Sequence, residues 1–113
     1  MEFRALKLIV PHLGWPYVDE AVMLAVKYEG VHLDTSALYG GSPSDTLRHL
    51  LIDHIGKHVV ESALHRRLLF GSNYPRVDIR RCARALGALE VSDSVKENLS
   101  RGNAIRLLGL ETP

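Results

Sequence analysis

The feature that most constrains the fold is a strand–loop–helix unit that occurs three times along the chain. Its strands are short and rich in branched or aromatic residues: "LKLIV" at residues 6–10, "VHLDTS" at 31–36 and "RLLFG" at 67–71. Strands that alternate with helices pair in parallel, because each crossover returns the chain to the same end of the sheet. The sequence therefore predicts an α/β fold, a parallel (βα)3 unit followed by C-terminal helices.

Capping residues and apolar stripes mark the first two helices. The first follows Pro16 and ends near Tyr28, and the second has Ser42 as its cap and Pro43 in its first turn. The second helix carries an apolar stripe at helical spacing: Leu47, Leu50, Leu51, Ile55 and Val59.

The later helices follow the same rules. The third is predicted to bury Ile79, Ala83 and Leu86, which recur at helical spacing. Residues 92–108 then predict a helix, a break at Gly102 and Asn103, and a short second helix.

The chain reads as one partial domain over residues 1–113, without a linker, a low-complexity tract or a charge block. Parallel strands are normally covered on both faces, and three helices on one side leave the other face and two edges open. We expect another copy of the chain, another protein, or a missing N-terminal part of a barrel to cover them.

Composition limits the classes of function. With 46% hydrophobic and 24% charged residues, the 113-residue chain resembles an average globular domain. Its net charge of +1 argues against nucleic acid as a partner, and no apolar run is long enough to cross a membrane. The N-terminus lacks the pattern of a signal peptide, and the single cysteine, Cys82, cannot form an internal disulfide, so we expect a cytoplasmic protein.

Four polar residues follow the predicted strands: His12, Asp34, Ser36 and Asn73. In parallel α/β sheets the reactive groups gather at the carboxyl ends of the strands, so these side chains are the candidate site. His12 can act as a general base or a ligand, or it can be a structural histidine bonded to a loop carbonyl. Asp34 can orient His12 or a substrate, although an aspartate before Thr35 and Ser36 often bonds local backbone donors.

Other motifs have simpler explanations. His54 and His58 have a spacing that can chelate zinc, but the catalytic glutamate of the HExxH pattern is missing, so we expect them on a packing or solvent surface. The Gly40–Gly41–Ser42 loop can cradle a phosphate or form a plain turn.

The basic stripe and the cysteine also have simple structural explanations. The stripe, Arg76, Arg80 and Arg84, fits a solvated helix face better than a nucleic-acid contact. Arginines flank Cys82 and can lower its pKa, yet an ordinary helix cysteine is the better interpretation.

Three segments, "KLIVPHLGWPYVDEAVMLAVKYEGVHLDTS", "RLLFGSNYPR" and "GNAIRLLGL", resemble the amidohydrolase-related superfamily of metal-dependent hydrolases and nonoxidative decarboxylases. The resemblance spans nearly the whole chain in order. It implies the C-terminal portion of a distorted (β/α)8 TIM barrel, with the sixth, seventh and eighth strand–helix units and the terminal helices.

The resemblance also assigns roles. His12 matches the histidine after strand six that family members use for substrate activation or proton transfer, and Asn73 falls on the strand-eight aspartate that binds the metal. Trp15, Tyr74 and Arg76 lie in the matching "GWP" and "GSNYPR" loops. With Asp34 and Ser36 they are candidate substrate contacts.

The family's other metal ligands would precede Met1, and a neutral amide is a weaker ligand for a hard divalent ion than a carboxylate. No metal ligand is therefore assigned in this chain, although a complete barrel could hold a weakly bound zinc or manganese. Asn73 then indicates either a branch of the family that works without a tightly held metal or a decayed site.

Two functions follow as hypotheses. In the first, the chain is the C-terminal part of an amidohydrolase-like hydrolase or decarboxylase of a small-molecule substrate, inactive alone because most metal ligands are missing. In the second, it is a noncatalytic half-barrel that self-associates or docks on a partner. The resemblance implies a hydrolase only if the missing N-terminal strands complete the barrel, and it assigns neither a substrate nor a cofactor.

Overall fold

The computed structural model describes residues 6–36, 42–74 and 76–110. Its centre is a sheet of three parallel strands in the order β1 (Leu8–Val10), β2 (Val31–Asp34) and β3 (Leu68–Leu69). In the register of the sheet Leu8 lies opposite Val31, and Leu33 lies opposite Leu68. The predicted α/β fold with a parallel (βα)3 unit is confirmed. The strands are shorter than predicted, because parallel pairing covers only part of each predicted segment.

The helices follow the strands as the sequence indicated. A short 3₁₀ segment, η1 (Pro11–Gly14), leads from β1 to α1 (Val18–Lys27). After β2 come α2 (Pro43–Leu47), the π-helical segment η2 (Arg48–Gly56) and α3 (Lys57–Ser62). The Ser42 hydroxyl accepts a hydrogen bond from the Asp45 amide at 3.2 Å, which confirms the predicted cap. Gly56 has a φ of 101°, so the long helical region bends there.

The C-terminal third consists of helices only. These are α4 (Ile79–Ala88), α5 (Asp93–Glu97), the π-helical segment η3 (Asn98–Gly102) and α6 (Asn103–Leu108). The predicted break at Gly102 and Asn103 is wrong, because both residues keep helical backbone angles. A widened π-helical turn accommodates the glycine without ending the helical path.

The predicted buried face of the third helix was also partly wrong. Cys82, Ala85 and Leu86 are buried, whereas Ile79 and Ala83 are exposed. The buried set continues at Leu89, and the arginines of α4 are exposed.

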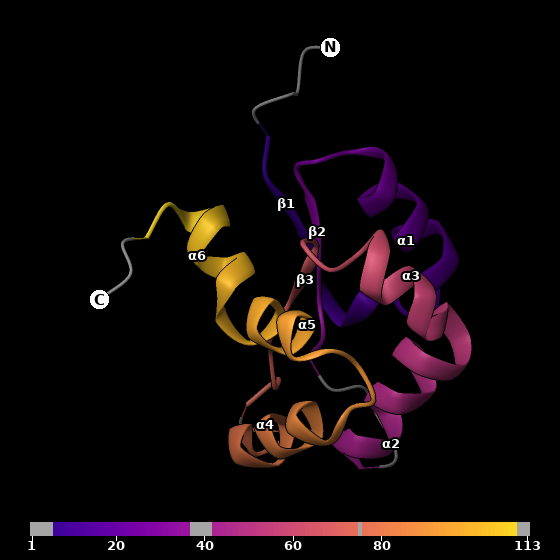
Figure 1. Ribbon diagram of the computed structural model, residues 1–113, viewed down its shortest axis with the longest axis vertical. Coiled ribbons are helices and arrows are strands. Elements are labelled where there is room, and N and C mark those ends of the chain that lie inside the picture. Colours follow the sequence, from indigo (N-terminus) through magenta and orange to yellow (C-terminus); the bar gives the residue numbers. More distant parts are fainter. Residues whose placement is uncertain (1–5, 37–41, 75, 111–113) are drawn as a thin grey trace.

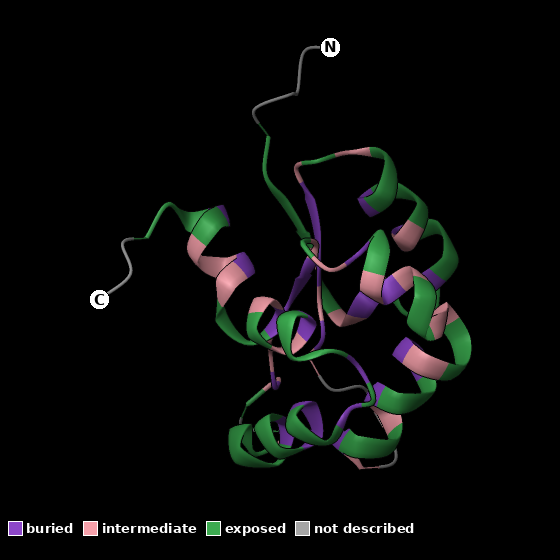
Figure 2. Cartoon of the chain, viewed as in Figure 1, coloured by how far each residue is buried: buried purple, intermediate pink, exposed green. Residues whose placement is uncertain are grey.

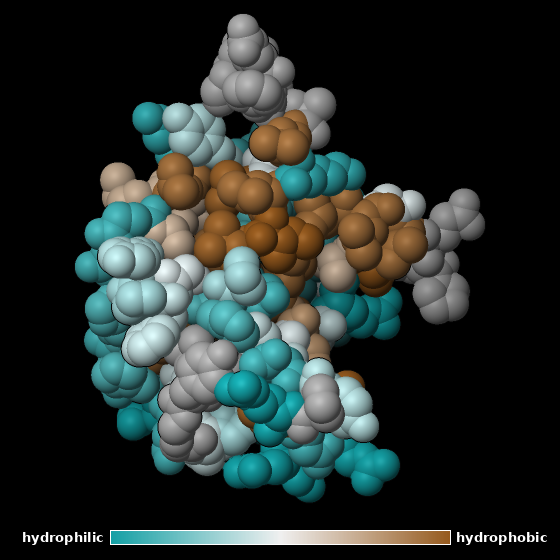
Figure 3. Space-filling view, turned by 180° about the vertical axis from the view of Figure 1, so that it is seen from behind, coloured by the Kyte–Doolittle hydropathy of each residue, from teal (hydrophilic) through white to brown (hydrophobic). Residues whose placement is uncertain are grey.

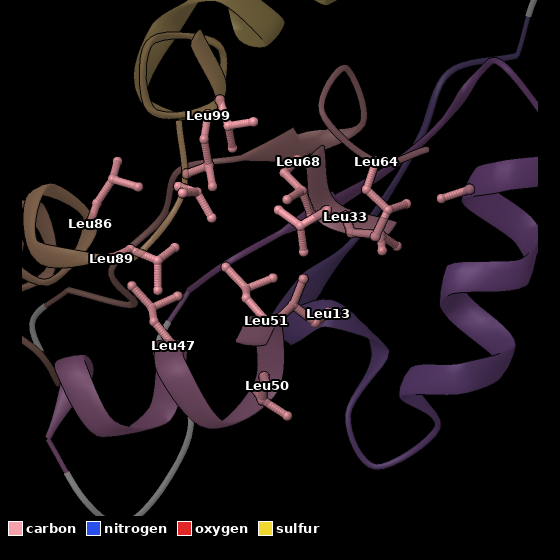
Figure 4. Close-up of a cluster of buried hydrophobic side chains, with 14 of the residues drawn as sticks. Leu13, Leu33, Leu47, Leu50, Leu51, Leu64, Leu68, Leu86, Leu89 and Leu99 are labelled. Carbon is pink, nitrogen blue, oxygen red and sulfur yellow. The ribbon is translucent and has the colours of Figure 1, made fainter. Parts of the chain in front are cut away.

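Leucines from the sheet and from the helices packed on it form the core. Leu33 in β2 and Leu68 in β3 are fully buried, together with Leu51 in η2 and Leu64 after α3. Figure 4 shows these side chains converging between the sheet and the helices. Leu13 joins the same cluster, so the loop that carries His12 is anchored in the core.

The face that we expected to be open is partly covered. Figure 1 shows α1 and α3 on one side of the sheet and α6 on the other. As a result β2 is buried along Val31–Leu33, and β3 is buried as well. The exposure is concentrated on the edge strand β1, where Leu8 and Ile9 are 44% and 45% exposed (Figure 2). Within the described ranges, no helix has both the length and the apolar character needed to span a membrane.

Candidate functional site

The site is organised around the carboxylate of Asp34, the last residue of β2. One of its oxygens, Oδ1, accepts three hydrogen bonds: from the Ser36 amide at 2.8 Å, the Ser36 hydroxyl at 2.5 Å and the His12 amide at 3.2 Å. The first of these is the local backbone bond expected of an aspartate at this position. The last joins the loop after β1 to the end of β2. Asp34 therefore fixes the relative position of two strand ends.

Ser36 extends this network to the ring of His12. The His12 Nδ1 atom lies 2.8 Å from the Ser36 hydroxyl oxygen and 3.3 Å from the Ser36 carbonyl oxygen. A carbonyl can only accept, and the hydroxyl proton is already directed to Asp34, so Nδ1 must be the donor. In the neutral ring this leaves Nε2 as the basic nitrogen. Among the residues that the structure describes, Nε2 has no hydrogen-bond partner.

His12 also has an unusual backbone. It and Leu13 have φ angles of 57° and 55°, and Gly14 follows with 77°. Positive φ is uncommon for residues other than glycine, and such strain tends to occur at functional sites. Burial of Leu13 and the Asp34 bond to the His12 amide hold this conformation.

Asn73, the second candidate, follows β3 and also has a positive φ, 67°. Asparagine tolerates this conformation better than most residues. Its carbonyl accepts a hydrogen bond from the Arg76 amide at 3.0 Å, which closes the loop. Its half-buried side-chain amide makes no hydrogen bond to a described residue, so it is available to another group.

The ends of β2 and β3 lie in contact. A Cβ atom placed on Gly71 would come within 3.2 Å of the Ser36 Cβ, so the loop that leads to Asn73 passes directly beside Ser36. The structure thus gathers His12, Asp34 and Ser36 in one hydrogen-bonded group, with the Asn73 loop against it. Trp15 follows the end of β1 in sequence, and Tyr74 and Arg76 follow the end of β3; all three are exposed.

Other predicted candidates stand apart from this group. His54 lies 2.8 Å from Asp19, and Ser42 serves as a helix cap. Gly40 and Gly41 lie outside the described residues. Burial raises the pKa of the Cys82 thiol despite the nearby Arg81, so its flanking arginines do not activate it.

The donor set does not fit a divalent metal. In the described ranges no three His, Cys, Asp or Glu side chains come together as a metal-binding group. At the site itself, one oxygen of Asp34 is already engaged by three donors, and Asn73 offers a neutral oxygen. A metal in this region would need ligands from elsewhere.

Sequence reasoning missed the role of Gly14. A Cβ atom at Gly14 would lie 2.4 Å from the Ala21 Cβ, so only glycine lets the His12 loop approach α1 this closely. The "LGWP" segment contains the residue, but sequence alone does not reveal a close approach to a helix that follows it.

Comparisons with known proteins identify the family. The family model described as Amidohydrolase matches residues 2–110, and the chain belongs to this family. No curated protein matches the chain.

Several solved structures are similar. An uncharacterised TIM-barrel protein from Bordetella bronchiseptica has 25% identity and a TM-score of 0.74, with 96% of this chain and 36% of that one covered. A dihydroxybenzoic acid decarboxylase from Polaromonas sp. JS666, with bound manganese and 2-nitroresorcinol, has 20% identity, a TM-score of 0.65 and coverages of 99% and 36%. An amidohydrolase from Burkholderia multivorans with bound zinc has 21% identity, a TM-score of 0.67 and coverages of 97% and 46%.

The chain thus spans less than half the length of each of these structures. Its three parallel strands and C-terminal helices correspond to part of a TIM barrel, as the sequence resemblance implied.

Proposed function

We propose that this chain supplies the acid–base part of an amidohydrolase-type active site, in which His12 transfers a proton and Asn73 contacts a small-molecule substrate. The observation that carries the proposal is the Asp34–Ser36–His12 chain of hydrogen bonds, which presents Nε2 of His12 as the basic nitrogen. The positive φ angle of His12 supports it, since strained residues cluster at functional sites.

The network suits a group that gains and loses a proton. When Nε2 takes up a proton, Nδ1 keeps its own and the ring becomes positively charged. The Ser36 hydroxyl links the charged ring to the Asp34 carboxylate, because it accepts a hydrogen bond from Nδ1 and donates one to Asp34. Asp34 thus stabilises the charged ring without contacting it directly.

Two reactions of the family can use such a group. In a hydrolysis, Nε2 removes a proton from water as the water oxygen attacks the carbonyl carbon of the substrate. In a nonoxidative decarboxylation, protonated Nε2 delivers its proton to the carbon of the aromatic substrate that carries the carboxylate. The electrons of the breaking carbon–carboxylate bond form the new C–H bond as CO2 leaves. Similarity to a decarboxylase and to a zinc-bound amidohydrolase keeps both reactions in the proposal.

The proposal gives Asn73 a substrate contact. Its amide can donate to a substrate oxygen and accept from a hydroxyl, which a carboxylate cannot do in both directions. Zinc or manganese, as bound in two of the similar structures, would need ligands from outside the described residues and would be held weakly by a neutral amide. We therefore derive no step through a metal.

The substrate contacts of the proposal extend to the loops around this pair. Trp15 and Tyr74 offer exposed aromatic surfaces, and Arg76 offers a charge that attracts a carboxylate. The proposal includes a cytoplasmic location, which the free, buried thiol of Cys82 supports.

Activity assays test this function. The 113-residue chain should not turn over 2,6-dihydroxybenzoate or simple esters alone, with or without zinc or manganese. Coexpression with the part of the Polaromonas decarboxylase barrel that the chain does not cover should give turnover of the dihydroxybenzoate. In that complex His12→Gln should lower the rate by about 10² or more, as for loss of a general acid or base. Rapid turnover by the chain alone, or full activity of His12→Gln, would contradict the proposal.

The matched control is His58→Gln. The His58 side chain is exposed on α3 and makes no hydrogen bond to a described residue, so this variant should keep the activity of the complex.

A second candidate function rests on the apolar edge of the sheet. The β1 apolar strip consists of exposed residues in or just before β1 and at or just after the end of α6: Leu6, Leu8, Ile9, Leu108 and Leu110. Figure 3 shows apolar side chains gathered on this side of the molecule. An exposed edge strand also offers unpaired backbone groups. As the second candidate we propose a noncatalytic half-barrel in which two copies associate through this strip.

Sedimentation tests the second candidate. The chain should sediment as a dimer at tens of micromolar, and Ile9→Lys should return it to a monomer. Met23→Lys, which places the same charge at an exposed apolar position on α1, should remain dimeric. A monomeric parent chain would contradict this function.

A further inference from the structure

A basic pocket lies at the end of the sheet opposite the candidate site. It is lined by residues that precede all three strands, by His32 of β2 and by α6, with a volume of about 460 Å³. Six of its lining residues are ionisable: Lys7, Glu29, His32, Arg66, Arg67 and Arg106. Because the strands are parallel, their starts converge on this amino-end pocket as their ends converge on the candidate site.

The charges of the pocket are unbalanced. Four permanent cations line it, and Glu29 is the single carboxylate among its lining residues. Within the described part of the chain, none of the four cations has a carboxylate within 4.0 Å. The ion pairs found there lie elsewhere: Arg48–Glu90, His54–Asp19 and Arg101–Glu97.

Backbone and amide contacts hold three of the cations in place. The Lys7 ammonium donates to the Leu107 carbonyl at 2.6 Å, and the Arg67 Nε donates to the Ala25 carbonyl at 3.1 Å. Arg106 donates to Asn98 and Asn103. An ammonium has three donors and a guanidinium five, so each cation keeps N–H groups for a ligand.

A buried polar residue fixes the wall that α6 provides. Asn103 is 1% exposed, and its Nδ2 donates to the carbonyls of His65 and Leu68 at 2.9 and 2.8 Å. These bonds attach α6 to the start of β3, so Arg106 and Arg67 keep their relative positions.

His32 of β2 lines the pocket, and its surroundings there shift the pKa of its imidazole. Burial lowers the pKa of its imidazole, and its hydrogen bond to the Gly30 carbonyl partly offsets this effect. Three cations lower the pKa further: Arg67, Arg106 and Lys7. The lowered pKa disfavours the charged imidazole beside these cations, and a ligand that carries negative charge would relieve the unbalanced charge.

We propose that the amino-end pocket binds a small oxyanion with two negative charges, phosphate or a phosphate monoester. Arginine and lysine are the side chains that hold phosphate oxygens, and the volume exceeds what a bare ion needs, which leaves room for an organic substituent. In a TIM barrel the residues at this end of the sheet contribute to stability and not to catalysis. The bound anion would therefore hold α6 against the residues that precede the strands. The proposal does not depend on the catalytic role of His12.

Calorimetric titration tests the proposal on the 113-residue chain at pH 7.5. Inorganic phosphate and phenyl phosphate are titrated separately at constant ionic strength, with chloride as the balancing ion. Saturable one-to-one binding of either is expected, and tighter binding of phenyl phosphate would identify a monoester as the better ligand. Heat that does not saturate, or that chloride reproduces, would overturn the proposal.

Arg66 provides the clearest variant. It is exposed and makes no hydrogen bond to a described residue, so Arg66→Gln should fold normally. It should weaken phosphate binding at least 10-fold, and Arg66→Glu more. Arg80→Gln, an exposed arginine on α4, should bind as the parent chain does. Equal losses in the Arg66 and Arg80 variants would overturn the proposal in favour of a nonspecific charge effect.

A second readout places the anion. The His32 ring titration, followed by NMR, should move to higher pH with saturating phosphate, because the bound charge offsets the field of Lys7, Arg67 and Arg106. Glu29 and Arg66, which also line the pocket, are present in both states and do not change the sign. A His32 titration that phosphate leaves unchanged would show that the anion does not bind here.

Discussion

The two ends of the sheet use polar residues in opposite ways. At the carboxyl ends of the strands, Asp34, Ser36 and His12 satisfy one another through hydrogen bonds of 2.5 to 3.2 Å. At the amino ends, four cations line a pocket with one carboxylate. The polar groups at the carboxyl end are paired with one another. Within the described residues, the cations at the amino end have no carboxylate partner within 4.0 Å.

This difference shows what the chain can determine by itself. A network whose members satisfy one another needs nothing else to hold its geometry, so the position of the His12 ring follows from the chain alone. An unbalanced cluster of cations repels itself unless something outside it supplies negative charge. This contrast is the basis for proposing a preorganised reactive group at the carboxyl end and a bound anion at the amino end.

The largest expected effect comes from a substitution in the loop that carries His12, at the carboxyl end of the sheet. Gly14→Ala would place a Cβ 2.4 Å from the Ala21 Cβ at a φ of 77°. Left-handed strain of about 1–2 kcal/mol and overpacking of about 1–3 kcal/mol should lower the free energy of unfolding by roughly 3 kcal/mol. Urea denaturation measures the change.

Gly109→Ala is the control for this substitution. Gly109 also has a positive φ, 66°, but nothing lies within 4 Å of an added Cβ. It should lose about 1–2 kcal/mol, the strain contribution alone. Equal losses at Gly14 and Gly109 would show that the close approach to α1 does not constrain the His12 loop.

The next effect concerns the amino end. Asn103→Ala removes the donor to two carbonyls, those of His65 and Leu68, and should cost about 2–3 kcal/mol of unfolding free energy. Asn98→Ala, which removes a single contact to the exposed Arg106, should cost less than about 1 kcal/mol. Denaturation curves of the two variants give the comparison, and an Asn98 loss as large as that of Asn103 would contradict it.

Removal of the central carboxylate should have a smaller effect on stability. Asp34→Ala leaves the amides of His12 and Ser36 without their acceptor, but the half-exposed site lets water replace it in part. We expect a loss of about 1–2 kcal/mol of unfolding free energy. Asp34→Asn, which keeps an acceptor oxygen, should lose less in the same urea experiment, and a larger loss for asparagine would argue against the assigned bonds.

The smallest effect is a pH dependence at the amino end. Because the pKa of His32 is lowered in the folded state, the unfolded chain binds more protons as the pH falls below the ordinary histidine value of about 6.5. The His32 contribution to stability is therefore present at pH 7.5 and declines as the pH falls toward the folded pKa. Thermal unfolding at a series of pH values should show this decline, and His32→Gln should flatten it. An unchanged slope in His32→Gln would contradict the shift.

Much of the fold could be predicted from the sequence because it depends on local chemistry. The Ser42 cap, Pro43 at the helix start and the buried leucines of η2 follow from residues close in sequence. The buried face of α4 was harder, since Ile79–Ala83–Leu86 and Cys82–Ala85–Leu86 both have helical spacing. Which of the two faces is buried depends on how α4 packs against α2, an element distant in sequence.

The candidate site was predictable in part for the same reason. Parallel strands place His12, Asp34 and Ser36 at one edge, which spacing alone indicates. The order of the hydrogen bonds, with Ser36 between the carboxylate and the ring, was not predictable, because it depends on how the loop after β1 turns back over β2. The amino-end pocket was missed because its residues precede three different strands, and α6 completes it from the far end of the chain.

The central claim is that Nδ1 of His12 carries the proton and Nε2 is the base. Long-range ¹H–¹⁵N spectra of the labelled chain at pH 8 measure this directly, since the two ring nitrogens of a neutral imidazole have distinct chemical shifts. The account predicts a protonated Nδ1 in the parent chain and a shift toward mixed tautomers in Ser36→Ala. A parent chain with the proton on Nε2, unchanged in Ser36→Ala, would contradict it.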